Sequence, residues 1–105
     1  MDITDNLEAL LARGTDGAML RFTLASRYFE RGELERAREH AAVAVELDAD
    51  YSAAWKLLAK IQAASGLTQE AAATYRRGIA AAERRGDRQA AREMQVFLRR
   101  LGGQE

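Results

Sequence analysis

The chain has 105 residues, 48% of them hydrophobic, and this length is expected to form a single domain. It contains no cysteine, which excludes disulfides and thiolate metal sites, and it has no apolar run of the roughly 18 residues that a membrane span needs. Residues 1–14 lack the basic start and the apolar stretch of a signal peptide, so a soluble, cytoplasmic protein is expected.

The formal net charge is zero, but the charges are unevenly placed along the chain. Residues 1–52 carry 11 acidic and 6 basic side chains, whereas residues 53–105 carry 5 acidic and 10 basic ones. A uniformly basic surface for nucleic acid is therefore missing. An acidic partner at the C-terminal half and head-to-tail self-association both stay open as hypotheses.

Proline is absent and good helix formers are abundant, which favours an all-α fold. Glycine and capping residues divide the chain into about six helices. With their caps included, these helices are predicted at residues 3–13, 16–31, 34–47, 50–65, 68–85 and 87–101. The side chains expected to cap helix N-termini are those of Asp16, Asp50, Thr68 and Asp87.

Two parts of the chain are related by an offset of 34 residues. The offset pairs identical residues in four places: Leu24 with Leu58, Ala25 with Ala59, Gly32 with Gly66, and Ala37 with Ala71. These identities fall at expected packing and turn positions. A fixed period of this size indicates stacked supersecondary units.

The second copy resembles the tetratricopeptide repeat family, whose pattern is W-x2-L-G-x2-Y followed by A-x3-F and a late proline. The residues that carry the resemblance are, in order, Trp55, Leu58, Ala59, Gln62, Ala71, Tyr75 and Gly78. Arg21 and Gln62 depart from the pattern at its two aromatic positions. The resemblance implies an α-solenoid, a right-handed superhelical stack of antiparallel helix hairpins whose close crossings need small residues.

The whole chain is predicted to be one tetratricopeptide-repeat-like domain. Residues 18–51 and 52–85 form its two repeats, residues 1–14 form an N-terminal half-repeat helix, and residues 87–101 form a C-terminal capping helix. Solenoids of this kind need about three repeats for stability and have atypical terminal units, which agrees with this division.

In the family that the chain resembles, the first helix of each hairpin lines a concave groove that usually holds a peptide. A helical wheel at about 100° per residue assigns side chains of this chain to the groove. They are Met19, Phe22, Ser26 and Phe29 in the first hairpin, Ala53, Lys56, Lys60 and Ala63 in the second, and Arg92, Val96 and Arg99 in the last helix. The groove is expected to run from aromatic to basic.

The sequence therefore predicts a non-catalytic scaffold or adaptor that binds a segment of another protein. The segment would place an apolar anchor near Phe22 and Phe29, and acidic groups or a C-terminal carboxylate near Lys56, Lys60 and Arg92. The alternative is that the N-terminal helix or a second copy covers the two phenylalanines. A second copy there would make the chain a self-assembling subunit that dimerises through the groove.

Catalysis and nucleic-acid binding find less support in the sequence. His40 is the only histidine, stands beside Glu39 and is expected to be a solvated surface residue, so no catalytic residue, metal site or cofactor is predicted. Arg-Arg pairs at residues 84–85 and 99–100 fall in final helical turns, where the helix dipole favours cations. Without aromatic residues among the arginines, nucleic-acid binding ranks below the other two hypotheses.

Overall fold

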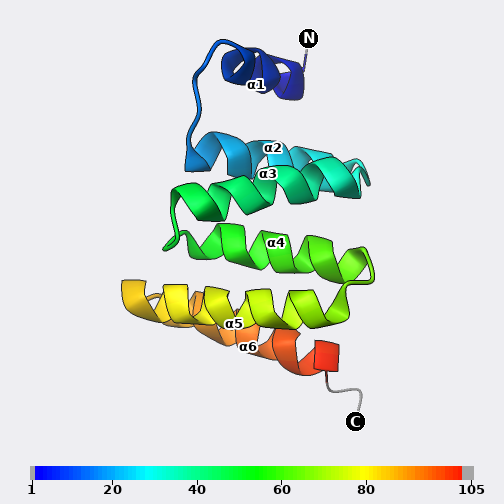
Figure 1. Ribbon diagram of the computed structural model, residues 1–105. Helices are drawn as coiled ribbons and strands as arrows, with labels where there is room; N and C mark the ends of the chain where they lie inside the picture. The colour runs from blue at the N-terminus through cyan, green and yellow to red at the C-terminus, as the bar shows by residue number, and fades with distance from the viewer. Residues whose placement is uncertain (1, 103–105) are drawn as a thin grey trace.

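The structure, a computed structural model, describes residues 2–102. In this part of the chain the backbone forms six helices and no strand, which confirms the all-α prediction. The helices are α1 (Ile3–Ala12), α2 (Ala18–Glu30), α3 (Leu34–Leu47), α4 (Ser52–Ala64), α5 (Thr68–Arg85) and α6 (Arg88–Gly102). They are stacked in chain order in a body of 46 × 29 × 18 Å (Figure 1).

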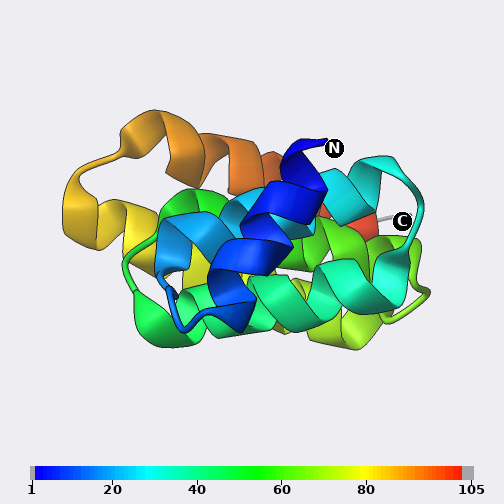
Figure 2. The same cartoon turned by 90° about the horizontal axis from the view of Figure 1, so that it is seen from above.

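Each helix packs mainly against its neighbours in the chain. α2 and α3 form one hairpin, α4 and α5 form the second, and α3 joins them by packing against α4 (Figure 1). At one end α6 packs along α5. At the other end α1 lies across the first hairpin (Figure 2). This arrangement of neighbours is that of an α-solenoid, as predicted.

The two hairpin turns close in the same way. Gly32 and Gly66 have φ angles of +77° and +81°, a left-handed conformation that glycine adopts without steric cost. The following residue then folds back onto the helix, because the Glu33 N–H donates to the Tyr28 carbonyl at 2.9 Å and the Leu67 N–H donates to the Gln62 carbonyl at 2.8 Å. This helix ending requires a left-handed residue and explains why glycine recurs at the offset of 34.

The core consists of two apolar clusters. The first surrounds Leu24, Tyr28 and Ile61, and the second contains Tyr75 and Met94. Burial of one such side chain stabilises the fold by roughly 1.5–3 kcal/mol. The small residues that the repeat pattern places at helix crossings are fully buried, namely Ala25, Ala37, Ala59 and Ala71.

Gly78 marks a close approach of three helices. A Cβ atom on Gly78 of α5 would lie 2.8 Å from the Trp55 Cβ of α4 and 2.5 Å from the Met94 Sδ of α6. Both distances are shorter than side-chain carbons tolerate. Glycine is therefore required for this crossing.

The predicted caps of the last two helices have different outcomes. Asp87 caps α6 as predicted, since its Oδ1 accepts a hydrogen bond from the Ala90 N–H at 3.0 Å. The prediction for Thr68 was wrong. Thr68 is the first residue of α5, and Leu67 occupies the capping position without a side-chain hydrogen bond.

The caps predicted for α2 and α4 were also wrong, because Gly17 and Tyr51 occupy the capping positions, and each aspartate is bonded to an arginine. The Asp16 carboxylate accepts a hydrogen bond from Arg21 Nε at 2.9 Å, and Gly17 takes the capping position of α2. The Asp50 carboxylate accepts from Arg84 Nε at 2.7 Å, far along the chain. A charge-assisted hydrogen bond to arginine is stronger than a bond to a neutral N–H group, which favours this choice of partner.

Candidate functional site

The predicted groove residues lie on α2, α4 and α6, the alternate helices of the stack, and we call their shared surface the α2/α4/α6 face. On it α2 contacts α4, and α4 contacts α6. Met19 begins the face on α2 and is 72% exposed. Ser26 on α2 and Ala63 on α4 are half-buried.

The aromatic end of the face is partly covered by the chain itself. Phe22 and Phe29 are half-buried and pack against the first core cluster. The Phe22 ring lies with its centroid 5.1 Å from that of Tyr51, in the loop between α3 and α4, at an interplanar angle of 39°. This tilted aromatic contact fixes the ring. Met19 remains the open apolar side chain beside it.

The two lysines of α4 both contact α6. Lys56 Nζ lies 2.9 Å from Glu93 Oε1, and Lys60 Nζ lies 4.9 Å from the centroid of the Phe97 ring. The hydrogen bond from Lys56 lowers the pKa of the Glu93 carboxyl. The structure therefore brings the lysines together, but it also supplies each of them with a partner from the last helix.

Arg92 does not join the lysines. It lines a depression of about 460 Å³ together with Glu83 and Arg88, at the far end of the stack. Lys56 lines a different depression of about 240 Å³, shared with Glu93 of α6.

Glu93 and Phe97 also belong to the α2/α4/α6 face, although they were not predicted to lie there. A signal was available, because they are spaced four residues apart, as Lys56 and Lys60 are, so each pair lies on one side of its helix. A negative charge and an aromatic ring are suitable partners for two cations.

His40 is not the solvated surface residue that the sequence suggested, since its side chain is only 12% exposed. Its Nδ1 lies 3.1 Å from Arg21 Nη1, and its Nε2 lies 3.7 Å from a Glu8 oxygen. The ring also stacks on Tyr28, with centroids 5.6 Å apart. Burial lowers the pKa of His40. The histidine thus connects α1, α2 and α3, which explains its position.

Within residues 2–102 no three His, Cys, Asp or Glu side chains are grouped so that they could hold a metal ion. Among the helices of that part, none combines the length and the apolar composition that crossing a bilayer requires.

The stacked hairpins, interlocking alanines and repeated glycine turns define a tetratricopeptide-repeat-like α-solenoid. Over 97 residues the chain is 47% identical to the TPR repeat-containing protein PA0015 of Pseudomonas aeruginosa, with 92% of each chain covered. The chain therefore belongs to the tetratricopeptide repeat family. A scan against family models found no match. The fold of this family generally mediates protein–protein interaction, and its members are generally non-catalytic scaffolds.

Solved structures show the same architecture. The chain is similar to protein BPP2914 from Bordetella parapertussis, with a TM-score of 0.82 and 46% identity over 96% of this chain and 88% of that one. It is also similar to a tetratricopeptide repeat domain protein from Salinibacter ruber, with a TM-score of 0.79 and 27% identity over 86% and 91% of the two chains. MamA shares the fold at a TM-score of 0.71 and 20% identity, covering 93% of this chain and 66% of that one.

Proposed function

We propose that this chain is a cytoplasmic, non-catalytic adaptor that binds a segment of another protein along the α2/α4/α6 face. The observation that carries the proposal is the combination of an open apolar side chain, Met19, with the edges of Phe22 and Phe29 on one helix and two lysines on the next. Apolar anchors supply most of the free energy of binding at such surfaces, and charges at their margin select the partner.

The lysines differ in what they offer to an acidic group. Lys56 is neutralised by Glu93, and Asp87 lines the same depression, so a carboxylate there would meet two negative charges. No carboxylate within residues 2–102 lies closer than 4.0 Å to Lys60 Nζ. We therefore expect Lys60 to attract an acidic ligand side chain more strongly than Lys56 does.

The Lys56–Glu93 pair is open to competition from a ligand. The two side chains are 30% and 44% exposed, and exposed ion pairs contribute only about 0–1 kcal/mol. A ligand carboxylate with an apolar anchor nearby can replace Glu93 as the partner of Lys56. Glu93 then acts as a competitor that sets how acidic the bound segment must be.

Selection of short random peptides on the whole chain, followed by fluorescence anisotropy with the selected peptides, tests the proposal. We expect the selected peptides to contain apolar and acidic residues. Their affinity should fall about tenfold in Lys60→Glu and should rise in Glu93→Gln. The double variant Phe22→Ala with Phe29→Ala should lose binding while its circular dichroism stays helical.

Two outcomes would count against the proposal. Affinity for acidic peptides that is unchanged by Lys56→Glu and Lys60→Glu would remove the role of the lysines. Binding that survives loss of both phenylalanines would place the site elsewhere. Sedimentation over a concentration series tests the alternative, because a dimer that the phenylalanine variant abolishes would identify a self-assembling subunit.

A further inference from the structure

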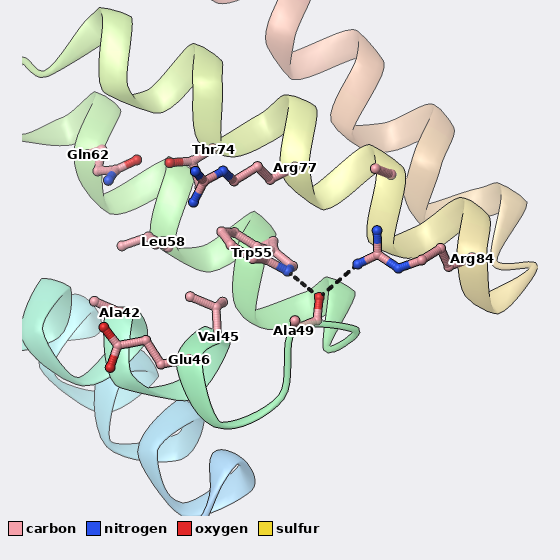
Figure 3. A pocket seen from close by; sticks show the side chains of 11 residues that line it. Ala42, Val45, Glu46, Ala49, Trp55, Leu58, Gln62, Thr74, Arg77 and Arg84 are labelled. Atoms are coloured by element: carbon pink, nitrogen blue, oxygen red, sulfur yellow. Dashed lines mark hydrogen bonds between the residues drawn. The ribbon is translucent and has the colours of Figure 1, made fainter.

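A second groove lies between α3 and α5, and α4 forms its floor (Figure 3). α3 and α5 each pack against α4 and do not contact one another. The space between them has a volume of about 680 Å³, within the roughly 300–1,000 Å³ that is usual for ligand sites. We call it the outer groove. None of the residues predicted from the sequence to bind a partner lines it.

The floor of the outer groove is a stripe of α4. Trp55, Leu58 and Gln62 all line the groove, and their spacing of three and four residues keeps them on one side of the helix. The Trp55 ring is held in place because its Nε1–H donates to the Ala49 carbonyl at 2.8 Å. Figure 3 shows this bond at one end of the groove and Gln62 at the other.

Gln62 leaves an unsatisfied acceptor at the floor. Its Oε1 atom is buried and has no hydrogen-bond partner among the described residues. A buried acceptor without a partner is destabilising, so its presence calls for a reason. A half-turn of the amide exchanges its oxygen and nitrogen, so the group can adapt to a bound donor. The repeat pattern has tyrosine here, and the departure to glutamine creates this polar point.

The walls of the groove carry opposite charges. Arg77 of α5 lies over the Trp55 ring, with its guanidinium carbon 5.8 Å from the centroid, and forms no ion pair with any residue in the range 2–102. Glu46 of α3 stands on the other wall and is likewise without an ion-pair partner in that range. Arg84 is already engaged by Asp50. The groove therefore has one open positive wall and one open negative wall.

We propose that the outer groove binds an extended segment of a partner protein that carries an apolar side chain and a neighbouring carboxylate. The apolar side chain would pack beside Arg77, against the parts of Trp55 and Leu58 that line the groove, and the carboxylate would pair with Arg77 on the positive wall. An extended backbone has free N–H groups, and one of them can donate to the Gln62 amide oxygen once the half-turn of the amide brings that oxygen toward the groove. The charge polarity across the groove fixes the orientation of the segment.

The only tryptophan of the chain reports on occupancy of this groove, because Trp55 lies in its floor. The probes are short random peptides displayed on phage, selected on the intact chain and then synthesised. We expect apolar and acidic sequences that shift the Trp55 emission. Ala80→Arg, which fills the groove from α5, and Arg77→Glu should each weaken these peptides at least tenfold.

Matched variants separate the two faces of the molecule. Ala64→Arg adds the same side chain at an exposed position outside the groove and should leave affinity and emission unchanged. Phe22→Ala should also leave this class of peptides unaffected, since Phe22 belongs to the α2/α4/α6 face. Circular dichroism and thermal melting confirm that each variant is folded.

Three outcomes overturn the proposal. The first is that no selected peptide shifts the Trp55 emission. The second is that the shifting peptides bind Ala80→Arg and Arg77→Glu as tightly as they bind the unmodified chain. The third is a shift that depends on protein concentration without peptide and is lost in Ala80→Arg, which would make a second copy the occupant. Peptides whose affinity falls only in Phe22→Ala bind the α2/α4/α6 face, so they test the proposed function and not the outer groove.

Discussion

The two ends of the helical stack are closed by different kinds of contact. At the C-terminal end α6 packs through apolar side chains, with Met94 fully buried and its sulfur against Gly78. At the N-terminal end Thr4 is the one residue of α1 that is buried. Leu7 and Leu11 of that helix are only half-buried where they pack against the first core cluster, and polar contacts add to them, since the Tyr28 hydroxyl donates to Glu8.

This difference separates two roles that a terminal helix can have. Apolar burial depends on volume and shape, and it is insensitive to pH and salt. Hydrogen bonds between charged and partly exposed groups contribute less and change with protonation. We therefore expect α6 to unfold with the whole domain, and α1 to open locally at a lower free energy.

The largest effect is expected from Met94→Ala. The side chain is fully buried among α4, α5 and α6, so its removal leaves a cavity and should lower the free energy of unfolding by about 2–5 kcal/mol. Urea denaturation measures the loss. Met19→Ala is the matched control, because Met19 is 72% exposed, and it should change stability by less than about 0.5 kcal/mol. Equal losses in the two variants would contradict the assignment of α6 to the core.

The next largest effect is expected from Gly78→Ala. The added Cβ would meet the Trp55 Cβ at 2.8 Å, and this overpacking should lower the free energy of unfolding by about 1–3 kcal/mol. That net loss already includes the gain of up to about 1 kcal/mol that a helix obtains when alanine replaces glycine. Thermal melting should show a lower Tm. Gly102→Ala serves as the control, because a Cβ on Gly102 meets no atom within 4 Å, and it should leave Tm unchanged or slightly raised.

Features that depend on nearby residues could be predicted from the sequence. The turns at Gly32 and Gly66 and the cap at Asp87 each close within a few residues, so local chemistry determines them. Asp16 and Asp50 look equally suitable as caps in the sequence. Neither occupies the capping position, and the arginine that bonds Asp50 comes from the other hairpin, which no local pattern reveals.

For the candidate site, the sequence predicted which side of α4 carries the lysines, but not which side of α6 turns toward them. The wheel placed Lys56 and Lys60 on one side of α4, and the structure agrees that both contact α6. The partners Glu93 and Phe97 were missed because the repeat pattern does not set the rotation of α6. Burial of Met94 sets that rotation, and this contact becomes visible only in three dimensions.

A smaller effect is expected from Tyr28→Phe, which removes the hydroxyl that donates to Glu8 of α1. The free energy of unfolding should fall by about 1 kcal/mol. Amide hydrogen exchange should accelerate in α1 more than in α6, because the lost bond lies between α1 and α2. Tyr51→Phe is the control, since the Tyr51 ring contacts Phe22 on the other side of the hairpin. Equal acceleration at both ends would show that α1 belongs to the global unfolding unit.

The smallest effect is a pH dependence caused by His40. Burial lowers the pKa of His40 in the folded chain, against the opposing effect of Glu8, while the unfolded chain keeps the ordinary value of about 6.5. Below that pH the unfolded chain binds the proton more readily. The contribution of His40 to the free energy of unfolding is thus fully present above about pH 7, and it falls as the pH drops through 6.5.

Urea denaturation between pH 8 and pH 5 measures this slope, and His40→Gln should flatten it. Carboxyl groups with lowered pKa, such as those of Asp16 and Glu93, lose their contribution only nearer their ordinary values of about 4, so the two windows do not overlap. Because His40 joins α1 to the first hairpin, the acid-induced loss should appear first in the hydrogen exchange of α1. A slope that persists in His40→Gln would mean that another group controls the N-terminal end, and the contrast between the two ends would then rest on packing alone.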